Sequence, residues 1–279
     1  MKLGAHVSIQ GGVDTAPDRA KAIGGETFQI FTKSQRQWQA KPLVQEQVSA
    51  FREKLGHYSY YLACVHASYL INLASPKENT LRKSREAMID ELLRAEELAL
   101  PYVVVHSGAH MGEGVEQGLK QLIQSIEHVL SETAGRTNVK LLLENSAGQG
   151  TTLGADLDQL KTVRDAFVGE DRLAFCLDTC HLFAAGYDFT SAEAYQRLKA
   201  EIDRQIGSRN VYVLHFNDSK KTPGSRLDQH EKIGHGKIGA QPFSFWIRDP
   251  DWDHTIAILE TPGGEDNYRR ELQLLKGFR

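Results

Sequence analysis

The sequence has 279 residues, of which 41% are hydrophobic and 25% are charged, a composition typical of a globular protein with one large or two medium domains. Its formal net charge of −3 shows no global basic signature of a nucleic-acid-binding protein. No apolar run approaches the roughly 20 residues that a membrane-spanning helix needs.

The cysteines indicate a reducing environment. Cys64, Cys176 and Cys180 form no disulfide framework, and two of them lie within apolar runs, as expected of buried, reduced thiols. The first residues lead directly into a strand-like run rather than a leader, so we expect a cytoplasmic protein. Cys176 and Cys180 are candidate zinc ligands, but Cys176 precedes Asp178 by two residues and is expected to pack below it.

Short apolar runs recur along the chain, separated by longer amphipathic stretches. The runs are nearly continuous, as expected of parallel strands that are buried on both faces. Eight strands are predicted, over Leu3–Val7, Thr27–Phe31, Tyr61–His66, Tyr102–His106, Val139–Glu144, Leu173–Asp178, Val211–His215 and Ile256–Glu260.

The stretches between these strands have the 3.6-residue period of helices that pack on a core. One apolar stripe runs from Val44 to Leu55, and Gly56 is expected to end that helix. Residues 75–78, Ser-Pro-Lys-Glu, are expected to form a capping box that opens the next helix, whose apolar face extends to Ala99. Three further helices are expected over residues 115–129, 157–167 and 195–206.

Alternating strands and helices predict an α/β fold. Eight such units without a linker or low-complexity tract favour one (β/α)₈ TIM barrel domain over residues 1–279. A doubly wound open sheet is the alternative. If it bound a nucleotide it would normally show a glycine-rich fingerprint after an early strand, and neither Gly11-Gly12 nor Gly24-Gly25 makes one.

Acidic and imidazole side chains mark the strand ends, where the active sites of TIM barrels lie. Seven of the eight expected strands carry such a residue at or beside the C-terminal end, namely His6, His66, His106, Glu144, Asp178, His215 and Glu260. Residues two positions earlier share the same face of a strand, and in six strands these are apolar or thiol. An apolar layer beneath a ring of ligands excludes water and fixes the ligand rotamers.

Three more candidates follow the strands. His181 lies shortly after Asp178, and Asp228 and His230 lie in the long loop after the seventh strand. Without His6, nine candidate ligands remain, whereas one zinc takes three or four. Two or three metals are therefore expected, and mixed histidine and carboxylate ligands favour zinc or manganese. Clustered metals about 3.5–4 Å apart are typical of hydrolysis at phosphorus.

Longer motifs surround these residues and cover nearly the whole chain. They are Gly4-Ala5-His6-Val7-Ser8, residues 31–38 (FTKSQRQW), 66–73 (HASYLINL), 144–150 (ENSAGQG), 178–188 (DTCHLFAAGYD), 215–220 (HFNDSK) and 259–261 (LET). Together they resemble the endonuclease IV family, the zinc-dependent apurinic/apyrimidinic (AP) endonucleases of base-excision repair.

This resemblance implies a TIM barrel with three zinc ions per chain, while the ligand types leave manganese possible at one or more sites. The first zinc would be bound by His66, His106 and Glu144, the second by Glu144, Asp178, His215 and Glu260, and the third by His181, Asp228 and His230. The family cleaves the phosphodiester 5′ to an abasic site, leaving a 3′-hydroxyl and a 5′-deoxyribose phosphate, and trims blocked 3′ ends. Glu144 or Glu260 is the candidate base, and the sequence does not divide these roles.

The resemblance also implies contacts with double-stranded DNA that carries abasic sites or blocked 3′ ends. Arg36, Tyr69 and Leu70 match residues that wedge into the minor groove at the lesion. From the residues alone, packing of Tyr69 and Leu70 on the following helix is an equal alternative. Further candidates for phosphate contacts are Lys33, Lys220 and Arg226, for which ordinary surface charges are the alternative.

His6 and His110 are expected to support the ligands from behind, while the role of His235 stays open. A monomer without membrane contact is expected, associated with the nucleoid if the source is bacterial.

The competing hypothesis is a divalent-metal sugar isomerase or epimerase, since such barrels also gather acidic and histidine ligands. The pair Asp228 and His230 and the loops that carry Arg36 and Tyr69 argue against it, because a small sugar needs neither a third metal nor groove wedges. A lesion-binding protein with structural zinc is a third hypothesis.

Overall fold

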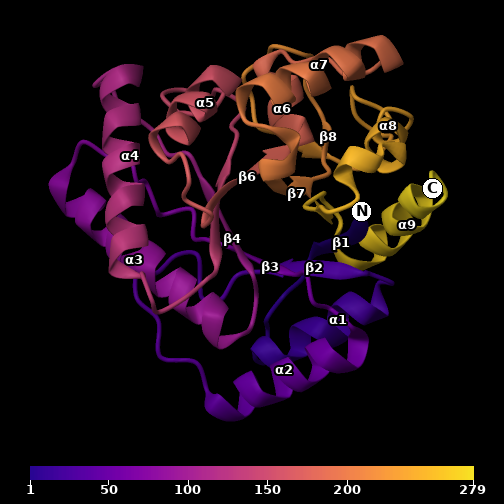
Figure 1. The fold of residues 1–279 in the computed structure, drawn as a ribbon. Coiled ribbons are helices and arrows are strands. Elements are labelled where there is room, and N and C mark those ends of the chain that lie inside the picture. Colours follow the sequence, from indigo (N-terminus) through magenta and orange to yellow (C-terminus); the bar gives the residue numbers. More distant parts are fainter.

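The computed structural model describes residues 1–279 and shows one closed parallel barrel surrounded by helices (Figure 1). Around the barrel the strands follow the order β1-β2-β3-β4-β5-β6-β7-β10, and β10 pairs with β1 to close the ring. Their bounds are β1 Lys2–His6, β2 Thr27–Ile30, β3 Cys64–His66, β4 Tyr102–His106, β5 Lys140–Glu144, β6 Leu173–Asp178, β7 Val211–His215 and β10 Ile256–Leu259. The predicted TIM barrel is confirmed, and the strand limits agree within three residues.

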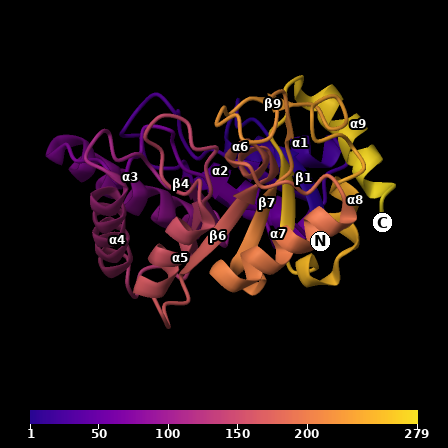
Figure 2. The ribbon, with the colours of Figure 1, turned by 90° about the horizontal axis from the view of Figure 1, so that it is seen from above.

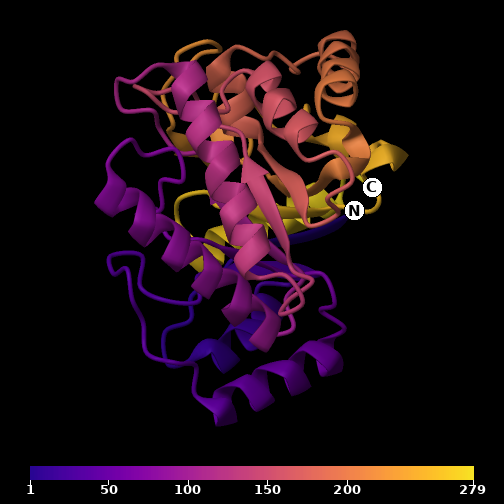
Figure 3. The same cartoon turned by 60° about the vertical axis from the view of Figure 1, so that its left-hand side comes forward.

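The helices form an outer ring around the strands (Figure 1), and Figure 3 shows the same helices from another side. They are α1 Ala16–Ala22, α2 Gln45–Tyr58, α3 Glu78–Glu97, α4 Val115–Glu132, α5 Leu157–Ala166, α6 Thr179–Ala185, α7 Ala192–Gln205, α8 Phe243–Arg248 and α9 Gly264–Lys276. Three 3₁₀ turns lie at Val13–Thr15, Ser208–Asn210 and Pro250–Trp252. No helix in the structure combines the length and apolar character needed to cross a membrane.

Two expected helix boundaries were wrong. Helix α2 continues through Gly56 and ends at Tyr58, because Ser59 takes the left-handed φ of 58° and turns the chain. The capping box does not form, since the Ser75 hydroxyl accepts a hydrogen bond from the Lys77 amide and Glu78 is already the first residue of α3.

The expected apolar face of α3 also extends two residues too far. Helix α3 ends at Glu97, and Ala99 is exposed with a left-handed φ of 56°. Leu98 and Leu100 on either side of it are buried instead.

The core has two parts, one inside the barrel and one between the barrel and the helices. The inner part is a cluster of nine buried residues, which includes the predicted layer of Cys64, Val104, Leu142, Cys176, Val213 and Ile258. Because these side chains fill the barrel below the strand ends, the residues two positions later point into its mouth.

A small antiparallel hairpin lies at that mouth. Strands β8 (Asp218–Ser219) and β9 (His230–Glu231) follow β7 and pair with each other outside the barrel. In Figure 2, β9 and the long loops lie along the upper edge of the molecule. The two chain termini meet elsewhere, where the Arg279 guanidinium donates to the Met1 carbonyl at 3.2 Å.

Candidate metal centre

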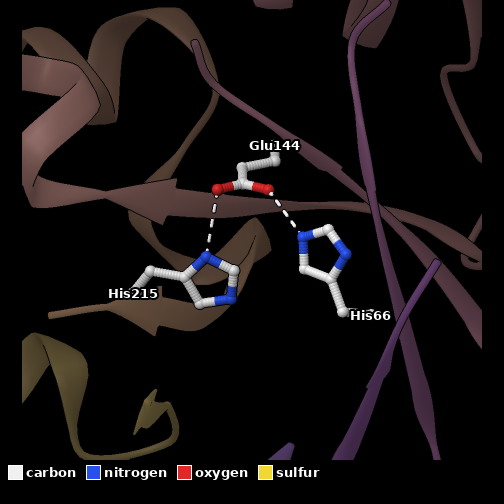
Figure 4. Close-up of side chains that lie close together, drawn as sticks. All are labelled: His66, Glu144 and His215. Atoms are coloured by element: carbon white, nitrogen blue, oxygen red, sulfur yellow. Dashed lines mark hydrogen bonds and ion pairs between the residues drawn. The ribbon is translucent and has the colours of Figure 1, made fainter. Parts of the chain in front are cut away.

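Glu144 lies at the middle of a buried cluster in the barrel mouth. It ends β5 and is 1% exposed. One carboxylate oxygen lies 3.3 Å from Nε2 of both His66 and His106, and the other lies 3.0 Å from Nδ1 of His215. Figure 4 shows the carboxylate between the rings of His66 and His215. The two oxygens thus face different histidines, the geometry expected of a bridging carboxylate.

The strand register produces this meeting. His106 pairs with Glu144 across β4 and β5, and Asp178 pairs with His215 across β6 and β7. Ligands on neighbouring strand ends are therefore held at the spacing of the sheet. Burial alone would raise the pKa of Glu144, but His215 and His106 hold it well below its usual range, so the carboxylate is ionised.

Asp178, His215 and Glu260 form a second group whose ligand atoms lie within 4.8 Å of one another. Glu260 follows β10 directly, and its carboxylate lies 3.3 Å from Nδ1 of His215. Asp178 also caps α6, since its side chain accepts a hydrogen bond from the His181 amide at 2.9 Å. The His181 ring lies between the mouth and the loop after β8, with Nδ1 3.4 Å from Glu144 and Nε2 3.2 Å from Asp228.

A third group lies further out. Asp228 places one oxygen 3.2 Å from Nε2 of His181 and the other 3.2 Å from Nε2 of His230. Burial lowers the pKa values of both histidines, but Asp178 and Asp228 outweigh it and raise the pKa of His181 to about 10 and that of His230 to about 9. Both rings thus experience a strong negative potential.

The chemistry of the cluster fits metal ions. Every ion pair made by Glu144, Asp178, Asp228 and Glu260 is to histidine, and none is to lysine or arginine. Nε2 of His230 is buried and makes no hydrogen bond of good geometry, although carboxylate oxygens of Asp228 and Asp178 lie 3.2 Å and 3.5 Å away. Four carboxylates that face only imidazole nitrogens, with no lysine or arginine counterion, are the donor set that a divalent cation completes.

Three side chains that the sequence reasoning passed over orient these ligands. Gln29 of β2 donates to Glu260 at 2.7 Å, and its carbonyl oxygen lies 2.9 Å from Nε2 of His215. Asn217 donates to Asp178 at 2.7 Å, and Asn145 accepts from the Asp178 amide at 2.7 Å. The sequence offered a signal for Gln29 alone: a glutamine inside the apolar run of β2 is expected to be buried, and a buried polar side chain needs hydrogen-bond partners.

The two histidines expected behind the ligands differ. His6 lies against the cluster, with Nδ1 2.9 Å from Gln29 and 3.5 Å from Glu260. The structure does not bring His110 to the cluster. Its Nδ1 accepts from the backbone amides of Gly112 and Gly114, so it shapes the loop before α4.

Of the residues expected to contact DNA, all but Lys33 are at least partly exposed. Arg36, Lys220 and Arg226 are exposed, Leu70 is half-buried, and Tyr69 is 57% exposed. The Tyr69 ring lies over the cluster, with its centroid 5.5 Å from that of His66 and 5.3 Å from that of His106.

The prediction for Lys33 is corrected. Its side chain is 2% exposed, and its ammonium lies 2.6 Å from Asp90 and 3.4 Å from Glu91 on α3. A lysine held in this way contributes to packing and cannot reach a phosphate.

A cavity of about 390 Å³ opens beside the cluster. Its walls include Tyr69, His106, Asn145, His181 and Asp228, so it joins the first and third groups of ligands. The cavity is therefore lined by candidate ligands from both groups.

Comparisons with known proteins agree with this arrangement. A family model described as xylose isomerase-like TIM barrel matches residues 17–278. The chain is 43% identical to the probable endonuclease 4 of Chloroflexus aggregans over 279 residues, covering 99% of this chain and 97% of that protein. The crystal structure of endonuclease IV from Thermus thermophilus matches with a TM-score of 0.88 and 34% identity, covering 100% of this chain and 98% of that one.

More distant structures share the barrel alone. A D-tagatose 3-epimerase-like protein matches with a TM-score of 0.75 at 20% identity, covering 100% of this chain and 97% of that chain. This likeness shows how widely the barrel is used and does not support the sugar isomerase hypothesis.

Proposed function

Because the chain belongs to the endonuclease IV family, we propose that it hydrolyses the phosphodiester 5′ to abasic sites in double-stranded DNA. Water adds to phosphorus and the bond to the 3′ oxygen breaks, leaving a 3′-hydroxyl and a 5′-deoxyribose phosphate. The same hydrolysis would remove blocking groups from 3′ ends. The observation that carries the proposal is the meeting of all nine expected ligands in one barrel mouth.

The nine side chains fit three metal ions, which we propose to be zinc, with manganese as an alternative. His66, His106 and Glu144 would hold the first, Asp178, His215 and Glu260 with Glu144 the second, and His181, Asp228 and His230 the third. When bound, the metals would supply an activated water and stabilise charge on the phosphate oxygens.

The chain's own carboxylates would handle the proton of the attacking water. Burial alone would raise the pKa of Glu260, but His215 and His6 hold it well below its usual range. Glu260 and Glu144 are therefore both ionised at neutral pH, the form in which a carboxylate can accept a proton. Gln29, which donates to Glu260, fixes the direction in which that carboxylate points.

Recognition of the lesion would fall to the exposed side chains around the mouth. Arg36, Tyr69 and Leu70 would enter the minor groove, where a cation and apolar wedges unstack a step. A nucleotide without a base costs least to extrude, and the cavity beside Tyr69 and His181 could receive it. Lys220 and Arg226 would contact phosphates.

The test is incubation of the purified protein with a duplex that contains one abasic site. We expect incision 5′ to the site, none on an undamaged duplex, and loss of incision with Glu260→Gln. Glu116→Gln, an exposed carboxylate on α4, is the matched control and should retain activity. Metal analysis should give three ions per chain.

Other outcomes would select a competing function. Binding of the damaged duplex without incision would indicate a lesion-binding protein, and turnover of a ketose would indicate a sugar isomerase. We further propose that the protein acts as a monomer in the cytoplasm, on chromosomal DNA. Light scattering that gives a dimer mass in the presence of metal would contradict the monomer.

A further inference from the structure

We propose that Asp218 is a positioning residue that holds His230 in place and so sets the affinity of the outermost metal site. This inference rests on the proposed function, because it takes the third metal as bound by His181, Asp228 and His230. Asp218 is fully buried in β8, three residues after His215, and the hydrogen bonds of its side chain are all to backbone amides rather than to the nine ligands.

The Asp218 carboxylate is surrounded by backbone donors. One oxygen accepts from the amides of Ser219 at 2.7 Å and Ile238 at 2.9 Å. The other accepts from Gly234 at 3.0 Å, Gly236 at 3.0 Å and Gly239 at 3.2 Å. A single buried side chain thus satisfies five amides, four of which belong to the segment 234–239.

This segment is the direct continuation of the strand that carries His230. In the hairpin, Ser219 pairs with His230 and Asp218 pairs with Glu231. On the other side of β8, the Lys237 amide donates to the Ser219 carbonyl at 2.7 Å. Strand β8 therefore lies between β9, which carries His230, and the segment 234–239. The Asp218 side chain, on β8, hydrogen-bonds to that segment.

Close packing around Gly236 supports the contact between Asp218 and the segment 234–239. A Cβ atom added at Gly236 would overlap the Asp218 carboxylate and the Ser219 carbonyl, so the backbone there approaches as closely as only glycine allows. A second buried carboxylate, Glu271 of α9, accepts from the Ile233 amide at 2.6 Å and also from Thr261, the residue after Glu260. The chain that follows His230 is fixed from two directions.

The chain that precedes His230 is more exposed, although its backbone is hydrogen-bonded to α6 through the Gly224 and Arg226 amides at 3.1 Å and 2.9 Å. Residues 222–224 and 226–229 are exposed, and the Asp228 side chain is 45% exposed. The Asp228 amide donates to the Gln149 side chain at 3.3 Å. Asp228 therefore lies on the more exposed side of His230, whereas the chain after His230 is buried and is held by the Asp218 carboxylate.

Asp218→Asn keeps the shape but replaces one acceptor oxygen with an NH₂ donor that faces backbone N–H groups. At least the two amides on one side lose their acceptor, and the hairpin loosens. Loss of a direct hydrogen-bond partner of a ligand typically weakens metal binding by about 10–100-fold, and we expect a loss of this order because Asp218 fixes the backbone next to His230. We expect this loss at one of the three metals and little change at the other two, whose ligands end barrel strands.

The experiment compares full-length wild type, Asp218→Asn and Asp249→Asn. Asp249 is the matched control, a largely buried carboxylate that accepts from Tyr195 and from the Asp251 amide, on the segment before β10. Each protein is dialysed against graded chelator, and the zinc per chain is counted by mass spectrometry. Asp218→Asn should lose one zinc at about 10–100-fold lower chelator strength, while Asp249→Asn should follow wild type.

Three zinc ions held by Asp218→Asn with wild-type affinity would overturn the inference, even if its unfolding temperature falls. Should Asp218→Asn fail to fold, Glu271→Gln tests the same anchor from α9 and should shift the same single metal. Wild type that holds three zinc ions but does not incise an abasic duplex would remove the proposed function and leave the inference standing. Wild type with two zinc ions would overturn the third site, and this inference with it.

Discussion

The buried strand ends of the barrel mouth and the exposed loops around it are built in different ways. We call the strand ends the floor: His66, Glu144 and His215 are almost fully buried there and end strands of the closed sheet. We call the loops the rim, where Arg36 and Asp228 are exposed. Strand register sets the positions of the floor side chains, whereas the position of each rim side chain depends on the contacts that its loop makes. The proposed function would therefore place chemistry on the strand ends and lesion recognition on the exposed loops.

The largest expected effect comes from breaking the floor. Glu144→Gln keeps the volume but removes the charge that faces His66, His106 and His215. We expect Glu144→Gln to lose two metals and all measurable incision. This effect is much larger than the roughly 10–100-fold loss of metal affinity or activity that follows when a hydrogen-bond partner of a ligand is removed. Metal counting and abasic-site incision check it, and circular dichroism controls for folding. Full metal content in Glu144→Gln would mean that the floor does not depend on this bridge.

The outer ligands give the metal-free protein a pH dependence that the metal should remove. Without metal, the pKa values of His181 and His230 are raised to about 10 and about 9, above the ordinary 6.5. A raised folded-state pKa stabilises the protein fully below about pH 6.5, and this stability is lost as pH rises through 9 to 10.

The loss should be on the order of several kcal/mol for the two histidines together, since one pKa unit is worth about 1.4 kcal/mol. Urea unfolding of the chelated protein between pH 6 and pH 10 measures it. The zinc-loaded protein is the control and should lack this decline, because the metal takes the place of the protons. A metal-free protein with stability independent of pH in this range would contradict the electrostatic account of the outer site.

Lys33 shows that position in a rim loop does not imply exposure. In Lys33→Met the buried Glu91 carboxylate would lose its ammonium partner, and removal of one member of a buried pair costs about 3 kcal/mol. The double variant Lys33→Met/Glu91→Met removes both charges and should recover much of that loss. Urea unfolding checks both. Equal losses in the single and double variants would mean that the pair is not coupled.

The sequence predicted the floor well for a physical reason. Apolar runs mark buried parallel strands, and a polar residue at the end of such a run, as at Glu144 or Asp178, has nowhere to point except into the mouth. The same reasoning placed the apolar layer that contains Cys64 and Cys176, because side chains alternate along a strand.

The rim could not be predicted in this way, because its side chains lie in loops and their partners, where they have any, can be far away in the sequence. Lys33 looks like a surface lysine until α3 brings Asp90 and Glu91 against it. The predicted end of α2 was wrong because a residue other than glycine takes the left-handed conformation there. Ser59 ends α2 with a left-handed residue, although glycine suits that conformation better and Gly56 stands three residues earlier.

The smallest expected effect belongs to the rim residue with the fewest contacts. Arg36 is exposed, and no hydrogen bond or ion pair of its guanidinium holds it to the rest of the chain. Arg36→Ala should therefore leave the unfolding temperature and metal content unchanged while it weakens binding to an abasic duplex about tenfold, or about 1.4 kcal/mol. Fluorescence anisotropy over a range of salt concentrations checks it. Because a groove wedge acts at the lesion, the loss should be smaller on undamaged DNA, whereas a phosphate contact would weaken both duplexes equally and lower the salt slope by about 1. Equal weakening would move Arg36 from lesion recognition to general backbone binding, and the rim would then discriminate lesions through Tyr69 and Leu70.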